Sequence, residues 1–283
     1  MPSLCILTDS TVQFTKPVFP GHTLVKIIPS QTQSELAQPN SKFKASSPLF
    51  SSNKIQISKI FYPGVDEFRQ QFISLAHEYN EVIVLLHSSH LSPLFSYAHE
   101  AAMLVRGQVV VRMIETQTTS IGLGFLVQLA ADAALRNANS IEIERLLRTA
   151  IPHIYSVFCI PELSYLSRSG FIDYAQAYAG EMLGMLPIFS LEEGLLTSLE
   201  KVHNYHHLFD FFQEFLDEFS SLHHISIIQS IPAIVREGQT FREYVQFKFQ
   251  GTPFTEHPIN SSLATIFGPH SLGVFAIEIP NIK

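Results

Sequence analysis

The chain reads VIVLLHSSHLS over residues 82–92, where an apolar run passes directly into a polar segment. Five consecutive apolar residues followed by turn residues are typical of a strand that is buried on both faces. Residues 87–92 then open a helix and place hydroxyl and backbone N–H groups at the end of that strand. Ligands of parallel α/β sheets gather at this end, and such groups suit an anion such as a carboxylate. Capping of the helix by serine explains the same residues without a ligand.

The first half of the chain alternates between short apolar runs and helical patterns, which indicates a mainly parallel sheet with right-handed crossovers. Two other runs are also followed by hydroxyl-rich segments, TDST at residues 8–11 and, as a weaker case, TQTTS at residues 116–120. The expected strands are residues 4–7, 24–28, 82–86 and 109–114, and the expected helices are 65–79, 91–106 and 120–135.

A domain boundary is expected near residue 150. A chain of 283 residues suggests two domains, and Ser140 is expected to cap a helix that ends at about Ala150. We therefore expect two α/β domains, residues 1–150 and 151–283, with a mixed sheet in the second. The polar segment 29–58 predicts a long loop. Strands are expected at residues 155–160, 187–191, 225–229, 244–249 and 274–279, and helices at 174–185 and 206–221.

The composition of the chain favours some classes of protein and argues against others. Hydrophobic residues make up 46% of the chain and charged residues 15%, and the 23 phenylalanines could fill a core or line an apolar cavity. The net charge of −7 and the lack of a Lys/Arg cluster argue against nucleic acid as a partner. Cys5 and Cys159 lie in apolar runs, which predicts buried thiols in a reducing compartment. The apolar stretch 121–135 is too short and too polar to span a bilayer, and no leader opens the chain, so we expect a cytoplasmic protein.

Motifs along almost the whole chain resemble those of the DegV family. The segment CILTDST at residues 5–11 looks like the amino-terminal signature of that family, and LVKIIP at 24–29 resembles its second strand. SSHLS at 88–92, followed by Tyr97 and Ala98, is similar to its Ser-Ser-x-Leu-Ser segment. Its central motif is similar to LSYLSRSG at 163–170 with Ile172, and this match continues with LGMLPI at 183–188. The end of its last motif is similar to GP at 268–269 and LGV at 272–274.

The resemblance implies two α/β domains that enclose a fatty acid in a cleft between them. The acyl chain would enter an apolar tunnel, and Ser88 and Ser89 would lie near its polar end, with Ser120 nearby. The protein would bind lipid rather than catalyse a reaction, and a separate fatty acid kinase would be the partner that receives the bound acid. We expect no cofactor, because neither glycine-rich phosphate-binding motif is present.

The sequence departs from the family pattern at the expected head-group site. Ile60 stands where the family usually has a hydroxyl residue, and Ile266 stands where it usually has a histidine. His270, four residues further on, is a candidate replacement for that imidazole. Phe171 and Leu186 replace a usual arginine and a usual lysine, which would remove positive charge from a surface that meets the kinase.

Three alternatives remain open from the sequence. A hydrolase or transferase would use Ser88 or Ser89 as a nucleophile, but His87 should point away from Ser88 on the strand, and no Gly-x-Ser-x-Gly motif occurs. A scaffold could keep the fold and have lost the ligand, as Ile60 and Ile266 would allow. A metal site on residues 203–210 is disfavoured, because thirteen histidines make such spacings common.

Overall fold

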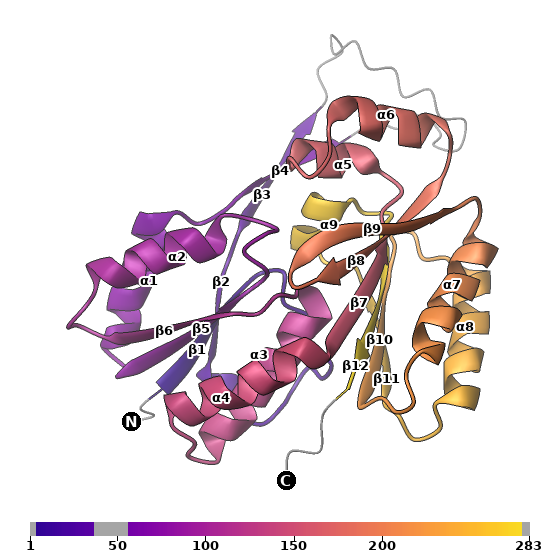
Figure 1. The fold of residues 1–283 in the computed structure, drawn as a ribbon. Helices are drawn as coiled ribbons and strands as arrows, with labels where there is room; N and C mark the ends of the chain where they lie inside the picture. The colour runs from indigo at the N-terminus through magenta and orange to yellow at the C-terminus, as the bar shows by residue number, and fades with distance from the viewer. Residues whose placement is uncertain (1–3, 37–55, 279–283) are drawn as a thin grey trace.

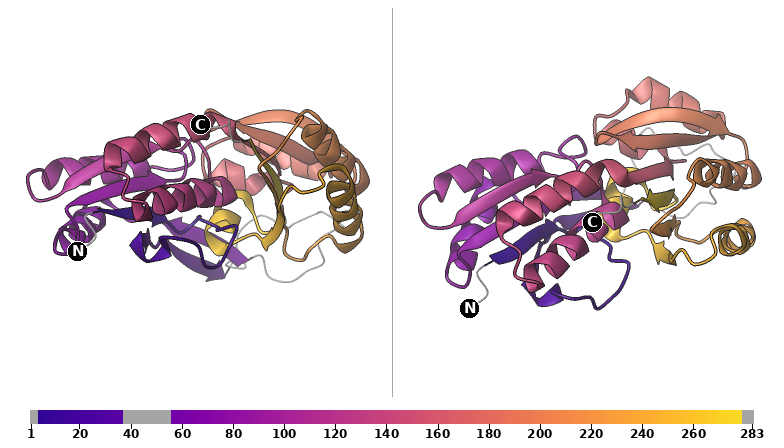
Figure 2. Two further views of the ribbon diagram at one scale, coloured as in Figure 1. Left: turned by 90° about the horizontal axis from the view of Figure 1, so that it is seen from below. Right: turned by 60° about the horizontal axis from the view of Figure 1, so that its bottom comes forward.

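A computed structural model describes residues 4–36 and 56–278, which form two α/β domains that lie side by side (Figures 1 and 2). The first domain contains a four-stranded parallel sheet in the order β2-β1-β5-β6. Its two central strands, β1 and β5, are buried along almost their whole length because helices cover both faces. The strands are β1 (Leu4–Asp9), β2 (Val25–Ile28), β5 (Glu81–Leu86) and β6 (Val110–Glu115).

Four helices cover the first sheet in two layers. Phe68 and Phe72 of α1 (Val65–Ala76) pack with Leu94 and Ala98 of α2 (Leu94–Leu104) on one face. On the other face, α3 (Ser120–Leu135) and α4 (Ser140–Ala150) bury their apolar sides against β1 and β5. Helix α3 is apolar on nearly all sides because it also lies against β7 (Ile154–Cys159) and β12 (Leu272–Ile277) of the second domain.

The second domain contains a six-stranded mixed sheet in the order β11-β10-β12-β7-β8-β9, in which only β10 and β11 run parallel. Helices α7 and α8 cover one face (Figure 1). On the other face, α5, α6 and α9 complete an apolar cluster that also takes in Leu91 and Ile121 of the first domain. The elements of the second domain are η2 (Ile151–His153), β7 (Ile154–Cys159), α5 (Leu163–Arg168), α6 (Tyr174–Met182), β8 (Leu186–Glu192), β9 (Leu195–Val202), α7 (Tyr205–Asp217), β10 (His224–Gln229), α8 (Val235–Lys248), β11 (Phe254–Pro258), α9 (Ser261–Phe267) and β12 (Leu272–Ile277). In the first domain, the short helix η1 (His22–Leu24) precedes β2.

The prediction of a loop over residues 29–58 is wrong at both ends of that segment, where the structure has β-strands. The strands β3 (Gln31–Leu36) and β4 (Gln56–Phe61) pair antiparallel, from Gln31 opposite Phe61 to Leu36 opposite Gln56. Both strands are rich in polar residues, so they lack the apolar run from which the other strands were predicted. The pair extends toward the second domain and lies against α9 (Figure 1). The central residues of the expected loop, 37–55, lie outside the described residues.

The expected strand at residues 244–249 is also wrong, because these residues end α8. The letters YVQFKF alternate as in a strand, but the buried side chains Gly238, Phe241 and Val245 follow helical spacing. Further elements went unpredicted: β9, β11, α5 and α9.

The helix near the domain boundary begins one residue earlier than expected. Asn139, not Ser140, caps it, and its side chain accepts hydrogen bonds from the backbone N–H groups of Ile141 and Glu142. Helix α4 ends at Ala150 and β7 begins at Ile154. The division between residues 150 and 151 stays a prediction.

Candidate functional site between the domains

The carboxyl ends of β1, β5 and β6 converge at one edge of the first sheet. His87 donates its backbone N–H to Asp9 Oδ2 at 2.7 Å, and Ser88 donates its backbone N–H to the Thr118 carbonyl at 2.8 Å. Thr119 in turn donates its hydroxyl to the Thr11 hydroxyl at 3.3 Å. The three polar segments noted in the sequence are therefore neighbours. They meet where connections leave β1 and β5 toward opposite edges of the sheet, which is the usual ligand position in open α/β folds.

Asp9 is a buried carboxylate with several hydrogen-bond donors. Its Oδ1 accepts a hydrogen bond from the Thr11 backbone at 2.8 Å and lies 3.0 Å from His87 Nδ1. Burial alone would raise the pKa of Asp9, but the charge and hydrogen bonds of His87, helped by Thr11, hold that pKa below its ordinary value. Asp9 therefore stays ionised at neutral pH, although neither it nor His87 has a side chain exposed to solvent.

His87 connects Asp9 to Ser92. Its Nε2 lies 2.6 Å from Ser92 Oγ, while its Nδ1 faces Asp9. The Tyr62 ring lies 6.2 Å from the His87 ring, and burial raises the pKa of the Tyr62 hydroxyl. The sequence argument that His87 cannot serve Ser88 agrees with this arrangement, because His87 is turned toward Ser92 instead.

Ser88 and Ser89 differ in their surroundings. Ser88 is fully buried and donates its hydroxyl to the Gly194 carbonyl of the second domain at 2.7 Å, whereas Ser89 is exposed. Gly194 lies in the turn between β8 and β9 with a φ of 84°. A Cβ atom at Gly194 would lie only 2.5 Å from Ser88 Oγ, so this turn docks closely onto the polar strand ends.

Ser120 is buried at the first position of α3. Its hydroxyl donates to Gln13 Oε1 at 2.8 Å, and its carbonyl accepts the Gln13 backbone N–H at 3.2 Å. Gln13 itself donates its side-chain amide to the Pro258 carbonyl of the second domain. Ser120 thus supports the junction between the domains through Gln13.

The two isoleucines lie on neighbouring elements, because β4 packs against α9. Ile266 is fully buried in the apolar cluster between the domains, and Ile60 is half-buried. His270 Nδ1 lies 3.0 Å from Glu162 Oε2, and this interaction with Glu162 raises the pKa of His270. A candidate replacement imidazole is therefore already engaged by a carboxylate.

The expectation that residue 186 belongs to an exposed partner surface is wrong. Leu186 is 9% exposed, because its position on β8 turns it into the apolar core beneath α7 and α8. Phe171 is half-buried and packs against the apolar cluster between the domains.

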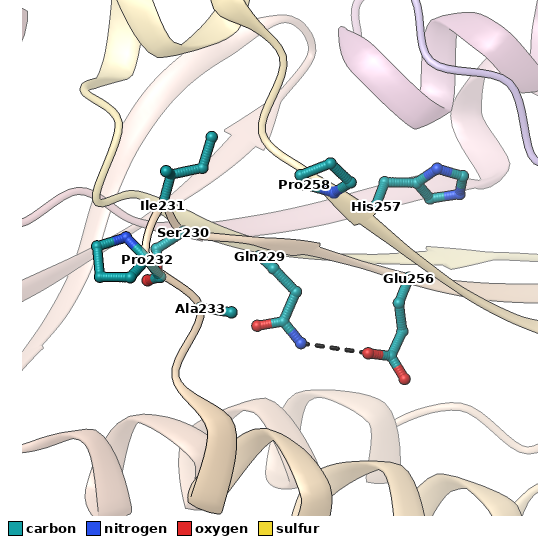
Figure 3. A pocket seen from close by; sticks show the side chains of 8 residues that line it. All are labelled: Gln229, Ser230, Ile231, Pro232, Ala233, Glu256, His257 and Pro258. Carbon is teal, nitrogen blue, oxygen red and sulfur yellow. Dashed lines mark hydrogen bonds between the residues drawn. The ribbon is translucent and has the colours of Figure 1, made fainter.

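A separate pocket of about 360 Å³ lies at the ends of β10 and β11 (Figure 3). Gln229 and Glu256 point toward α8, and the Gln229 amide donates to Glu256 at 3.3 Å, while His257 points away from them (Figure 3). Arg242 of α8 also binds Glu256. The pocket contains none of the residues predicted as ligand-binding.

Among residues 4–36 and 56–278, no three His, Cys, Asp or Glu side chains are grouped so that they could hold a metal ion. No helix in the described part of the chain is long and apolar enough to cross a bilayer.

The sequence placed Asp9, His87 and Ser92 in the polar segments after the strands but did not predict that they contact one another, and it gave no role to Gly194. The available signal was an aspartate and a histidine at the ends of two neighbouring parallel strands, β1 and β5, which pair Thr8 with Leu85. Nothing local in the sequence brings Gly194 to Ser88, which is 106 residues away.

Together these features define a two-domain α/β protein whose polar strand ends face an apolar cluster between the domains. The family model described as "Uncharacterised protein, DegV family" matches residues 3–278. This chain belongs to the DegV family.

Curated and solved relatives agree with that assignment. A DegV domain-containing protein of Staphylococcus aureus is 28% identical over 207 residues, which is 72% of each chain. The crystal structure of a DegV family protein from Corynebacterium glutamicum superposes with a TM-score of 0.77 at 17% identity and covers 99% of both chains. The fatty acid kinase B3 protein of Streptococcus pneumoniae, solved with linoleic acid, has a TM-score of 0.77 at 14% identity and covers 98% of this chain and 100% of that one.

Proposed function

We propose that this protein binds a long-chain fatty acid, or a similar acyl ligand, between its two domains and presents it to a fatty acid kinase. The proposal rests chiefly on membership of the DegV family over residues 3–278. Solved family members include one from Eubacterium eligens loaded with heptadecanoic acid, with a TM-score of 0.75 at 15% identity over 97% of this chain. The two buried, free thiols are consistent with a cytoplasmic location.

The apolar cluster between the domains supports the acyl part of the proposal. Phe158, Phe189 and Ile266 of the second domain pack there with Leu91 and Ile121 of the first. Leu91 lies within the loop of polar residues that follows β5. An acyl chain among these side chains would therefore have its head group close to Ser88, and Ser89 and Ser120 lie in the neighbouring strand ends.

The head group would have few partners in this chain. A buried carboxylate needs hydrogen-bond donors, and each bond to a charged group contributes about 1.5–3 kcal/mol. Ile60 and Ile266 supply none, the Ser88 hydroxyl is bonded to Gly194, and His270 is engaged by Glu162. We therefore expect weaker discrimination between a free acid and its neutral ester than the usual residues of the family would give.

Mass spectrometry of ligands extracted from the purified protein tests the binding proposal directly. A retained long-chain acid supports it. A protein that arrives empty and binds no added fatty acid would instead support the scaffold alternative.

A competition titration of a fatty acid against its methyl ester tests the head-group account. The changes Ile60→Thr and Ile266→His should increase the preference for the acid by about tenfold or more for each bond regained. Thermal melting of each variant checks that the fold survives a histidine at the fully buried position 266. A strong preference for the acid in the unchanged protein would contradict this account of the head group.

A further inference from the structure

Asp9, His87 and Ser92 lie in a row at the carboxyl edge of the first sheet. His87 Nδ1 is 3.0 Å from Asp9 Oδ1, and His87 Nε2 is 2.6 Å from Ser92 Oγ. A hydroxyl, an imidazole and a carboxylate in this order are the parts of a nucleophilic serine with its base and its orienting acid. We propose that Ser92 is an activated nucleophile that attacks the carbonyl carbon of apolar carboxylic esters.

The Asp9 carboxylate determines which nitrogen of the His87 ring can act as a base. Asp9 is held in place by the backbone N–H groups of Thr11 and His87, and it is fully buried. When His87 is neutral, an ionised Asp9 facing Nδ1 at 3.0 Å favours the tautomer with its hydrogen on that atom. The lone pair of Nε2 then faces Ser92 and can accept the hydroxyl proton.

The position of Ser92 favours charge on its oxygen. Ser92 is partly exposed and lies between β5 and α2, a helix of eleven residues. The Leu94 backbone N–H donates to Ser92 Oγ at 3.3 Å, and the amino end of a helix favours negative charge. The row also spans β1 and β5, the strands from which connections leave in opposite directions.

The surroundings indicate an apolar substrate. Leu91, next to Ser92 in the chain, belongs to the apolar cluster between the domains. The acyl chain of an ester could lie against that cluster while its carbonyl meets Ser92. This inference is independent of the proposed carrier function, because a reactive Ser92 can be detected whether or not the protein retains a fatty acid.

The chemical step involves only the ester, the protein and water. The Ser92 oxygen forms a bond to the carbonyl carbon while its proton passes to His87 Nε2. The bond from that carbon to the alcohol oxygen then breaks, and the alcohol leaves with the proton from His87. Water, deprotonated by His87, hydrolyses the acyl–Ser92 ester and returns the free carboxylic acid.

A fluorophosphonate with a long alkyl chain tests the inference, because it reacts with activated serines by forming a P–O bond and releasing fluoride. Intact mass should rise by one adduct, and peptide mapping should place that adduct on Ser92. Ser92→Ala should abolish labelling. His87→Gln should slow it by about 100-fold or more, which is the usual contribution of a general base.

Ser96→Ala is the matched control, since Ser96 is an exposed serine in the first turn of α2, four residues after Ser92, and this variant should label at the original rate. Melting temperatures of all variants separate lost reactivity from lost folding, and mapping on the unaltered protein needs no variant. A protein without an adduct on Ser92, or with labelling that His87→Gln leaves unchanged, would show that the row only ties the strand ends together. Extraction of a fatty acid from that same protein would leave the carrier proposal standing.

Discussion

At the scale of single residues, Ser88 and Gly194 form a close contact between the domains. The hydroxyl of Ser88 donates to the Gly194 carbonyl. Gly194 adopts a positive φ and has no side chain, so the turn can approach the first domain closely. A Cβ atom on Gly194 would also lie only 3.2 Å from the Cα of Gln117. The turn between β8 and β9 is therefore fitted to the strand ends of the first domain.

Gly194→Ala should destabilise the protein more than Gly170→Ala. Both glycines have a positive φ, which costs an alanine about 1–2 kcal/mol. Only Gly194 also has neighbours within contact distance, and overpacking adds about 1–3 kcal/mol. Urea unfolding measures both variants. Adding Ser88→Ala to Gly194→Ala should recover part of the loss, and equal costs for the two glycine variants would contradict the docked turn.

Asp9→Asn should lower stability more at neutral pH than in acid. The folded pKa of Asp9 is lowered, so its contribution is present above the unfolded value of about 3.9 and is lost as the pH falls through the folded value. Removing the charge of a buried carboxylate that accepts several hydrogen bonds costs at least about 1.5–3 kcal/mol, the contribution of one hydrogen bond to a charged group. Urea unfolding at pH 7 and pH 3 should show a large difference from the unchanged protein at pH 7 and a smaller one at pH 3. A difference that does not depend on pH would mean that Asp9 is not ionised.

At the scale of elements, α8 shows how an alternating pattern can belong to a helix. In a strand, Val245, Phe247 and Phe249 would share one face. In the structure Phe241 and Val245 are buried against the second sheet, whereas Phe247 is 80% exposed.

Phe241→Ala should therefore cost about 3–5 kcal/mol, the usual loss for a buried phenylalanine. Phe247→Ala on the same helix should stay within about 0.5 kcal/mol of the original, as surface substitutions usually do. Chemical denaturation of the two variants makes the comparison. A large loss for Phe247→Ala would favour the strand interpretation of these residues.

At the scale of the whole molecule, three histidines of the second domain lie near the junction with the first. His223 contacts the Phe125 ring of α3 at 5.8 Å, and His257 precedes Pro258, whose carbonyl accepts from Gln13. Burial lowers the pKa of His223 and of His257. Burial, with the charges of His223, His257 and Lys16, lowers the pKa of His224 to about 4.

Stability should therefore fall as the pH drops from 6.5 toward 4. The unfolded chain binds a proton at His224 in this range while the folded protein does not, and a shift from 6.5 to about 4 corresponds to about 3 kcal/mol. His224→Gln should flatten part of this slope, and the remainder reflects His223 and His257. Urea unfolding at several pH values provides the measurement, and an unchanged slope in His224→Gln would contradict the role of this residue.

Local patterns were sufficient for most of the elements. Short apolar runs predicted β1, β2, β5, β6, β7, β8, β10 and β12. Among them β1, β5 and β12 are buried on both faces, which requires apolar residues along most of their length. Helix α3 was predicted to the residue, and α4 was predicted with its amino end one residue too late. The same patterns failed for β3, β4, β9 and β11, whose polar or half-exposed residues carry no such run, and for α8, where the burial of Phe241 rather than alternation sets the helix.

The chain alone also determined the family, the two α/β domains and the polar segments that follow β1, β5 and β6. Tertiary structure alone decided what those segments contact. His87 faces Asp9, which is 78 residues away in the sequence, because neighbouring parallel strands end side by side. His87 also contacts Ser92. Ser88 contacts Gly194 because the two domains pack against one another. Periodicity records which side of an element is buried, but partners distant in the sequence are set by packing, which no local pattern contains.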